Sequence, residues 1–238
     1  MVDFHSHVLP GMDDGSRSVL QSHEMLNKDL ADGATKVVCT PHFYADREDI
    51  SSFLDRRAAA VRSLCRETLP AGITLYLGAE VAYYSGISGS ADLCELCIRG
   101  TRVLLLEMPA WDWTDTAVDE VISLRKNGLL PVLAHVDRYP GRRERELVQK
   151  MQETEIPVSL NASAFLSWMT RRRALKMVQE HPVLLGTDCH DLSGRSPNMG
   201  RALEVIHARL GEDHVERLAG LGEMTLAGAV PVTDIDAN

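Results

Sequence analysis

The chain has 238 residues, of which 45% are hydrophobic and 25% charged, and it carries a formal net charge of −9 at pH 7. These values are ordinary for a water-soluble globular protein, and the acidic balance argues against a general nucleic-acid binder, which would usually be basic. The apolar runs are too short to span a bilayer, the N-terminus has no signal-peptide pattern, and five cysteines without a regular framework indicate reduced thiols and a cytosolic protein.

In chain order, short apolar runs alternate with amphipathic segments. The apolar runs predict strands over residues 2–5, 36–40, 73–80, 102–108, 130–136, 157–162 and 182–188. The amphipathic segments predict helices over residues 15–33, 51–67, 114–128, 143–153, 163–180 and 198–218. Ser16 or Ser18 would cap the first helix and Asp49 or Ser51 the second, because these side chains accept hydrogen bonds from N–H groups of the first turn.

This alternation indicates an α/β fold with parallel strands. Strands that are buried on both faces read as continuous apolar runs, as these do. Roughly seven strand–helix units in a chain of 238 residues come close to the usual size of a β/α barrel. No linker rich in Pro, Gly or Ser and no low-complexity segment divides the sequence, so we expect one domain over residues 1–238.

Chemically active side chains stand at the carboxyl ends of the predicted strands. In a parallel barrel all these ends face one bowl, where such enzymes place their active sites. The residues at the strand ends are His5, His7, His42, Glu80, Glu107, His135, Asn161, Asp188 and His190. A single histidine is more often a hydrogen-bonded structural residue, but coincidence explains this joint pattern poorly.

The spacing of these residues supports a shared site. His5 and His7 are two residues apart, so on an extended strand they point the same way, and Asp188 and His190 repeat the spacing. Asp3 has the same parity as His5, and we expect it to orient a ligating imidazole from outside the ligand set.

The carboxylates in this set predict bound cations. Glu80, Glu107, Asp188 and either Asp13 or Asp14 would bring about four carboxylates into one cavity, where they would repel one another unless several were protonated. Divalent metal ions remove this repulsion, and a mixture of imidazole and carboxylate ligands suits manganese, iron or zinc.

Two arginines follow candidate ligands closely enough to lie on the rim of the bowl. Arg138 comes three residues after His135, and Arg195 comes five residues after His190. Arginine forms forked hydrogen bonds to phosphate oxygens, so we expect this pair to bind a phosphoryl group. The basic runs RRER and TRRRALK lie within predicted helices, and we interpret them as solvated faces rather than as a docking site for an acidic partner.

A competing signature lies in the same stretch. The sequence CHDLSGRS fits C-x5-R-S, which is typical of cysteine-dependent tyrosine phosphatases and would make Cys189 the nucleophile. That loop needs a glycine-rich backbone at a helix N-terminus, whereas Cys189 stands between two candidate metal ligands and strand alternation points it away from them. We therefore interpret it as a packing residue. CELC at 94–97 lacks the second cysteine pair of a structural zinc site, and we expect a short helix there.

Seven segments resemble, in order, the motifs of a known family: FHSHVLPGMDDG, CTPHF, LGAEV, LLLEMP, AHVDRYPG, LNAS and GTDCHDLSGRSPNM. They are similar to those of the bacterial metal-dependent protein-tyrosine phosphatases of the PHP (polymerase and histidinol phosphatase) superfamily, which occur in capsular and exopolysaccharide operons. The resemblance covers residues 1 to about 205, with DDG and H-x-x-R-Y as its most specific parts, and the C-terminal segment beyond it matches poorly.

This resemblance implies a distorted (β/α)7 barrel with a cluster of three divalent metal ions, usually manganese. The residues that match the family's metal ligands are His5, His7, Asp14, His42, Glu80, Glu107, His135, Asp188 and His190. Glu80 matches a bridging ligand, and Arg138 and Arg195 match the arginines that contact phosphate. Of the acidic pair, the resemblance favours Asp14 as the ligand, a choice that spacing leaves open.

The activity implied by the resemblance is hydrolysis of protein phosphotyrosine. The partner would be the tail of a bacterial tyrosine autokinase, in the regulation of capsule or exopolysaccharide synthesis. The expected mechanism is a single step, in which a hydroxide that bridges the metals attacks phosphorus in line while the metals and arginines neutralise the phosphoryl oxygens. We expect no nucleic-acid partner and no membrane-embedded part.

Three other functions fit the same residues less well. A PHP phosphatase that acts on a small phosphomonoester, such as histidinol phosphate, would use the same metals. The acidic balance disfavours a nuclease, and a regulatory binder would need a broken ligand set, whereas this set is complete. Hydrolysis of a phosphotyrosine peptide, histidinol phosphate and a phosphodiester, compared with Mn²⁺ present, separates these functions.

Overall fold

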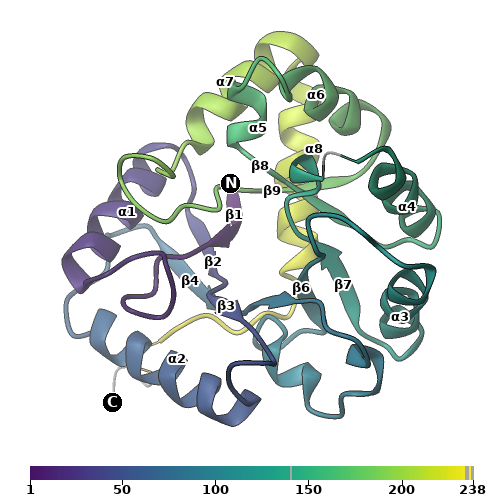
Figure 1. The fold of residues 1–238 in the computed structure, drawn as a ribbon. Coiled ribbons are helices and arrows are strands. Elements are labelled where there is room, and N and C mark those ends of the chain that lie inside the picture. The colour runs from purple at the N-terminus through teal and green to yellow at the C-terminus, as the bar shows by residue number, and fades with distance from the viewer. Residues whose placement is uncertain (140, 234–235, 237–238) are drawn as a thin grey trace.

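In the computed structural model, which describes residues 1–139, 141–233 and 236, parallel strands form a ring that helices surround (Figure 1). The strands are β1 Val2–Ser6, β2 Lys36–Cys39, β3 His42–Phe43, β4 Thr74–Leu77, β5 Glu80–Ala82, β6 Val103–Glu107, β7 Leu130–Leu133, β8 Val158–Asn161 and β9 Val183–Gly186. The helices are α1 Val19–Ala31, α2 Ile50–Leu64, α3 Asp115–Lys126, α4 Arg142–Gln152, α5 Ser163–Leu166, α6 Arg171–Glu180, α7 Met199–Leu210 and α8 Glu212–Thr225. Three short 3-10 helices are η1 Ile87–Gly89, η2 Leu93–Leu96 and η3 Val136–Arg138.

The strands pair in two parallel sheets that together close the ring. One sheet has the order β1-β2-β4 and the other the order β3-β5-β6-β7-β8-β9. The ring closes where the chain after β9 meets β1: the N–H of Asp188 donates to the carbonyl of His5 (2.7 Å), and the N–H of His7 donates to that of Cys189 (3.0 Å). The predicted α/β barrel of parallel strands is therefore confirmed.

Bends in two of the predicted strands distort the barrel. The strand predicted over 36–40 stops before Pro41, which has no N–H for a ladder hydrogen bond, and resumes as β3. The strand predicted over 73–80 is divided into β4 and β5. Beyond the bends, β3 and β5 pair with each other, and β5 pairs with β6, so that His42 lies opposite Glu80. The distortion thus brings two predicted ligands side by side.

Apolar side chains fill the inside of the barrel. They come from strands around the ring and form one cluster: Val2, Phe4, Val38, Tyr76, Val103, Leu105, Val132, Ala134 and Leu184. A larger cluster lies between the outer faces of the strands and the surrounding helices. The interior is therefore packed rather than hollow, and it supports the polar residues at the carboxyl ends of the strands.

Helix α8 closes the opposite end of the barrel. It lies so near β1 that a Cβ on Gly222 would be only 3.1 Å from the Cβ of Val2. Leu226, just after α8, is buried in the apolar cluster inside the barrel. The C-terminal segment, in which the resemblance to the family was poor, thus contributes to the core.

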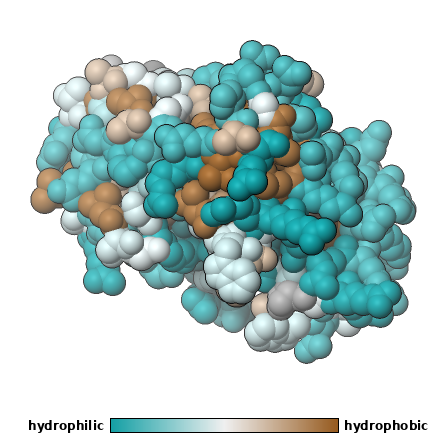
Figure 2. All heavy atoms as spheres, turned by 90° about the horizontal axis from the view of Figure 1, so that it is seen from above, coloured by the Kyte–Doolittle hydropathy of each residue, from teal (hydrophilic) through white to brown (hydrophobic). Residues whose placement is uncertain are grey.

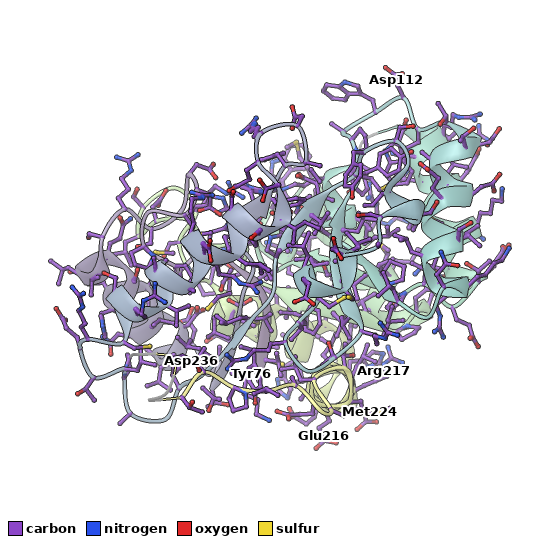
Figure 3. All side chains as sticks on the ribbon, turned by 90° about the horizontal axis from the view of Figure 1, so that it is seen from below. Tyr76, Asp112, Glu216, Arg217, Met224 and Asp236 are labelled. Carbon is purple, nitrogen blue, oxygen red and sulfur yellow. The ribbon has the colours of Figure 1, made fainter. Side chains whose placement is uncertain are left out.

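Beyond α8 the chain runs along the same end of the molecule. The N–H of Val232 donates to the carbonyl of Leu75 in β4 (2.8 Å). Figure 3 shows Met224 and Asp236 at one end of the molecule and Asp112, in the loop after β6, at the other. The C-terminal segment therefore lies far from the loops that follow the strands.

Two of the predicted helices are each broken into two. Residues 163–180 form α5 and α6, and the carbonyl of Leu166 at the end of α5 accepts a hydrogen bond from the side chain of Arg171 (2.9 Å). Residues 198–218 are divided into α7 and α8 at Gly211, whose φ of 91° few other residues adopt. Both breaks depend on contacts or backbone angles that a hydrophobic pattern does not encode.

Of the two candidate caps for each of the first two helices, the structure selects Ser18 and Asp49. The Oγ of Ser18 accepts a hydrogen bond from the N–H of Gln21 (3.2 Å), and a carboxylate oxygen of Asp49 accepts one from the N–H of Ser52 (2.8 Å). Ser16, the other candidate for α1, is buried instead.

The outer surfaces of the helices are mostly hydrophilic. Seen from the side where α5, α6 and α7 lie, hydrophilic side chains surround a smaller hydrophobic patch (Figure 2). Within the described part of the chain, no helix combines the length and the apolar character that crossing a bilayer requires.

Candidate metal centre

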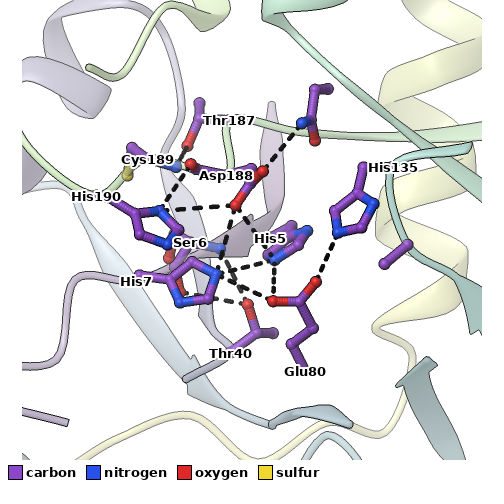
Figure 4. A network of polar contacts seen from close by, with 12 residues as sticks. His5, Ser6, His7, Thr40, Glu80, His135, Thr187, Asp188, Cys189 and His190 are labelled. Carbon is purple, nitrogen blue, oxygen red and sulfur yellow. Dashed lines mark hydrogen bonds and ion pairs between the residues drawn. The ribbon is translucent and has the colours of Figure 1, made fainter. Parts of the chain in front are cut away.

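Most of the side chains predicted as metal ligands gather at the carboxyl ends of the strands, and Figure 4 shows His5, His7, Glu80, His135, Asp188 and His190. His5 and His7 leave β1 with their Nε2 atoms 3.0 Å apart, so both point to one place, as their spacing predicted. Asp188, after β9, approaches them with its Oδ1 3.6 Å from the Nε2 of His5 and 3.5 Å from that of His7. The first and last strands of the barrel therefore contribute to the same cluster.

Glu80 is the carboxylate at the centre of the cluster. Its Oε2 lies 3.1 Å from the Nε2 of His5 and 3.3 Å from that of His7. The same oxygen lies 2.9 Å from the Nδ1 of His42, while Oε1 lies 2.8 Å from the Nε2 of His135. Burial alone would raise the pKa of Glu80, but the imidazoles, with that of His5 foremost, outweigh burial and hold the pKa well below its usual range.

Two more carboxylates stand nearer the solvent. The Oδ1 of Asp14 lies 3.2 Å from the Nε2 of His190 and 3.5 Å from that of His42, and this side chain is 67% exposed. The Oε1 of Glu107 lies 3.4 Å from the Nε2 of His135. Every residue predicted as a metal ligand thus belongs to one connected cluster.

The donor atoms of this cluster fit divalent metal ions. Three overlapping groups each bring donor atoms from three residues within 4.8 Å of one another: His5–His7–Glu80, His7–His42–His190 and His42–Glu80–Glu107. Glu80 Oε2, His42 Nδ1 and His190 Nε2 are buried and lie close to polar atoms of the cluster, yet none of the three makes a well-aligned hydrogen bond within the described residues. Buried polar atoms are almost always hydrogen-bonded, so ligand atoms that face one another without hydrogen-bond geometry fit a cation held between them.

Two of the candidate ligands have strained backbones. His135 has a φ of 33° and Asp188 a φ of 52°. Both angles lie in the left-handed region, which residues other than glycine rarely adopt. The strand predicted over 130–136 accordingly ends at Leu133, and His135 is anchored by its N–H, which donates to the Oγ of Ser159 (3.2 Å). Such strain persists only where the surrounding structure enforces it, and it is frequent at functional sites.

Two glycines let other parts of the chain pass close to His5 in β1 and His7 just after it. A Cβ on Gly186, at the end of β9, would lie 2.5 Å from the Cβ of His5. A Cβ on Gly15 would lie 2.4 Å from the carbonyl oxygen of His7. Because atoms cannot approach so closely, any larger residue at either position would displace β1 or the loop after it.

Asp13 orients one of the histidines. Its Oδ2 lies 2.7 Å from the Nδ1 of His7, which leaves the Nε2 of that ring facing the cluster. Burial opposes ionisation, but the contact with His7 outweighs it and lowers the pKa of Asp13 to about 2. The same carboxylate accepts hydrogen bonds from the N–H groups of Gly15 and His42, both at 2.9 Å. Spacing could not separate Asp13 from Asp14, whereas the structure gives the two different neighbours.

Asp3 does not contact an imidazole, so the prediction made for it is wrong. Its carboxylate accepts hydrogen bonds from the backbone N–H groups of His5 (3.2 Å) and Thr187 (2.8 Å). Parity placed Asp3 on the same side as His5, but it could not show that the segment after β9 would supply the partner of this carboxylate, Thr187. Asp3 instead stabilises the backbone where β1 meets the segment after β9, because it accepts hydrogen bonds from both.

Asn161, at the end of β8, contacts the cluster in a way that the sequence did not reveal. Its Nδ2 donates to the Oδ2 of Asp188 (3.0 Å). Its own N–H donates to the carboxylate of Asp137 (2.9 Å). The only sequence signal for this role was its position at a strand end.

Both predicted phosphate-binding arginines reach the rim of the cluster at Asp188. Arg195 donates to its Oδ1 (2.7 Å), and Arg138 donates to its Oδ2. Their side chains are 35% and 41% exposed, so both can meet a ligand that arrives from solvent. Arg173 holds the loop that carries Arg138, since it donates to the carbonyl of Tyr139 (3.2 Å).

Cys189 faces away from the cluster, as strand alternation predicted. Its thiol is buried, and burial raises the pKa of Cys189 well above its usual range, whereas a nucleophilic cysteine needs a lowered pKa. Its sulfur lies instead within 4.8 Å of carboxylate oxygens of Asp3 and Asp29. At CELC the chain forms η2, which confirms the predicted short helix.

Comparison with known proteins connects this architecture to a family. Residues 1–225 match the model of the family described as "Capsular polysaccharide synthesis, CpsB/CapC". The chain is 26% identical to the tyrosine-protein phosphatase YwqE of Bacillus subtilis, over 95% of this chain and 91% of that protein. It is 24% identical to the tyrosine-protein phosphatase CpsB of Streptococcus agalactiae, over 92% of this chain and 94% of that protein.

A solved structure has the same fold. It comes from work on YwqE of Bacillus subtilis and CpsB of Streptococcus pneumoniae, described as metal-dependent tyrosine phosphatases. It superposes with a TM-score of 0.84 at 22% sequence identity and covers 98% of this chain and 100% of that chain. The family match extends beyond the segments that carried the resemblance. The chain belongs to the CpsB/CapC family of capsular polysaccharide synthesis.

Proposed function

We propose that this protein is a metal-dependent phosphatase that hydrolyses phosphotyrosine in a protein. The observation that carries the proposal is the cluster around Glu80, with the exposed guanidinium groups of Arg138 and Arg195 on its rim. Candidate metal ligands beside partly exposed arginines suit a phosphoryl group, because cations and guanidinium groups both neutralise its oxygens. The relatives named tyrosine-protein phosphatases support phosphotyrosine as the substrate.

The three overlapping groups of donor atoms are the places that we assign to three divalent metal ions, with manganese as the expected ion. When bound, such ions activate water as a nucleophile and act as Lewis acids toward the phosphoryl oxygens. Glu80 belongs to two of the three groups, so its carboxylate would help to hold two of the ions. Asp13 keeps the His7 ring in place for this task through its Nδ1.

The two arginines would hold the substrate. Each donates to a different oxygen of Asp188, and a phosphoryl group at the rim offers them stronger acceptors for the same N–H groups. Binding from two sides would orient the phosphorus toward the cluster. The phenolate leaving group has a reference pKa of about 10, so its departure does not depend on a strong acid.

The phosphoprotein is, in this proposal, a tyrosine autokinase of capsule or exopolysaccharide synthesis that presents phosphotyrosine in its tail. The family's connection with capsular polysaccharide synthesis supports this choice. An exposed tail suits the site, because the arginines and Asp14 lie at the surface, where an extended peptide can reach them.

Removal of the metal tests the proposal. Chelation should abolish phosphate release from a phosphotyrosine peptide, and Mn²⁺ should restore it. Glu80→Gln should lower kcat/KM by about 100-fold or more even with Mn²⁺ present, because the shared carboxylate is lost. Cys189→Ser is the matched control, and it should retain activity because the thiol is buried and faces away from the cluster.

The choice of substrate separates this function from its alternative. Faster hydrolysis of histidinol phosphate than of the peptide would point to a small-molecule phosphatase. If no phosphate ester were hydrolysed with Mn²⁺ present, the proposal would be wrong. Loss of activity in Cys189→Ser would favour the cysteine mechanism instead.

A further inference from the structure

A groove lined with basic side chains begins at the rim of the metal centre and runs between α4 and α6. Its first part is a hollow of about 520 Å³, lined by Arg138, Arg145 and Arg173 among others. Arg145 and Arg173 also line the adjoining part, of about 330 Å³, together with Lys176. We call the two parts together the α4–α6 groove. Because Arg138 contacts Asp188, the groove opens directly beside the metal cluster.

Positive charge exceeds negative charge along this groove. Its acidic lining residues are Asp137, which is half-buried and whose pKa is raised by desolvation, and Glu180, which lies 3.7 Å from Lys176. Arg173 donates to backbone carbonyls, and burial together with the nearby charge of Arg145 lowers the pKa of Arg173. The guanidinium groups of Arg145 and Arg173 repel one another, and an anionic ligand bound between α4 and α6 would reduce this repulsion.

The excess of positive charge in the α4–α6 groove contrasts with the negative charge of the whole molecule. With a formal net charge of −9, the protein repels an acidic peptide except where the local potential is positive. The run RRER contributes Arg145 from α4, and the run TRRRALK contributes Arg173 and Lys176 from α6. The sequence favoured solvated faces for both runs, whereas the fold places them on the two sides of one groove.

We propose that the α4–α6 groove binds an acidic segment of the phosphoprotein that adjoins the phosphotyrosine. This inference rests on the proposed function, because Arg138 is shared between the groove and the place of the phosphoryl group. Glutamate or aspartate side chains of the segment pair with Arg145 and Lys176 along the groove. The enzyme thereby selects among phosphotyrosine sites by the charge of the residues beside them.

Peptides of equal length test the selection. Each carries one phosphotyrosine, flanked by glutamate, glutamine or lysine, and para-nitrophenyl phosphate serves as a substrate without flanks. The wild-type protein should prefer glutamate flanks over glutamine flanks by about fivefold in kcat/KM, mainly through KM, and about 0.5 M NaCl should remove the preference. Arg145→Glu should abolish or reverse the preference, whereas Arg62→Glu, the same charge change on α2, should keep it.

A binding measurement keeps the result independent of turnover. The fluorescence anisotropy of a labelled glutamate-rich peptide with unphosphorylated tyrosine should report binding to the wild type and to Arg62→Glu, and weaker binding to Arg145→Glu. Equal behaviour of Arg145→Glu and the wild type in both assays overturns the groove proposal. Binding that depends on Arg145, without hydrolysis of any substrate, supports the groove and overturns the proposed phosphatase function.

Discussion

At the scale of single residues, Asp13 and Asp14 show how two adjacent carboxylates acquire different tasks. Asp14 lies in solvent, 67% exposed, and faces His190 and His42. Asp13 is buried against the Nδ1 of His7, where a carboxylate fixes both the tautomer and the orientation of the ring. The sequence predicts that this acidic pair belongs to the site, but a loop has no regular period from which the direction of each side chain follows.

Asp13→Asn should weaken metal binding without removing a metal ligand. An amide holds the imidazole less firmly than a carboxylate does, and loss of such an outer partner typically costs about 10–100-fold in metal affinity. Titration calorimetry with Mn²⁺ measures the effect. Asp55→Asn, an exposed position on α2, is the control and should bind Mn²⁺ as the wild type does. Equal affinities of both variants would contradict the role given to Asp13.

At the scale of elements, the sequence predicts where strands lie better than how they bend. Strands that are buried on both faces read as continuous apolar runs in the sequence. For this reason each strand of the barrel either overlaps a predicted strand or, like β3, follows directly after one. The bends after β2 and β4 depend on which neighbours the strands pair with, and those neighbours are distant in sequence. Asp3 was misjudged for a related reason, because its partner, Thr187, lies in the segment after β9 and is distant in sequence.

The junction of β1 and β9 can be tested at Gly186. In Gly186→Ala the new Cβ would lie 2.5 Å from the Cβ of His5, so β1 must shift away from β9. Overpacking of this kind typically costs about 1–3 kcal/mol, and here it also displaces a candidate ligand. Urea unfolding and metal content measure the two effects. Gly220→Ala in α8, where no atom lies within 4 Å of the new Cβ, should be neutral or slightly stabilising.

At the scale of the whole molecule, the two ends of the barrel serve different purposes. The carboxyl ends of the strands carry the candidate metal ligands, and the amino ends are closed by α8 and the segment after it. The β/α alternation predicts the first of these, because the bowl follows from parallel strands. It could not predict the second, since nothing in the local pattern of the C-terminal segment says which surface Leu226 will cover.

Leu226→Ala should destabilise the fold and spare the metal centre. Removing a buried leucine side chain typically costs about 2–5 kcal/mol, and this one lies at the closed end of the barrel. The free energy of unfolding in urea should fall accordingly, while the Mn²⁺ affinity of the folded protein stays near that of the wild type. Met224→Ala, at a side chain that is 74% exposed, should change stability by no more than about 0.5 kcal/mol. A large loss of Mn²⁺ affinity in Leu226→Ala would show that the two ends are coupled.

The contact between β1 and the segment after β9 also determines when the barrel can close during synthesis. His5 and His7 emerge from the ribosome well over a hundred residues before Asp188 and His190, which follow only after nearly the whole barrel has been translated. Closing so long a loop is slow, because its entropy must be lost before the contact is gained. The set of candidate metal ligands is therefore complete only when β9 has been translated and has met β1.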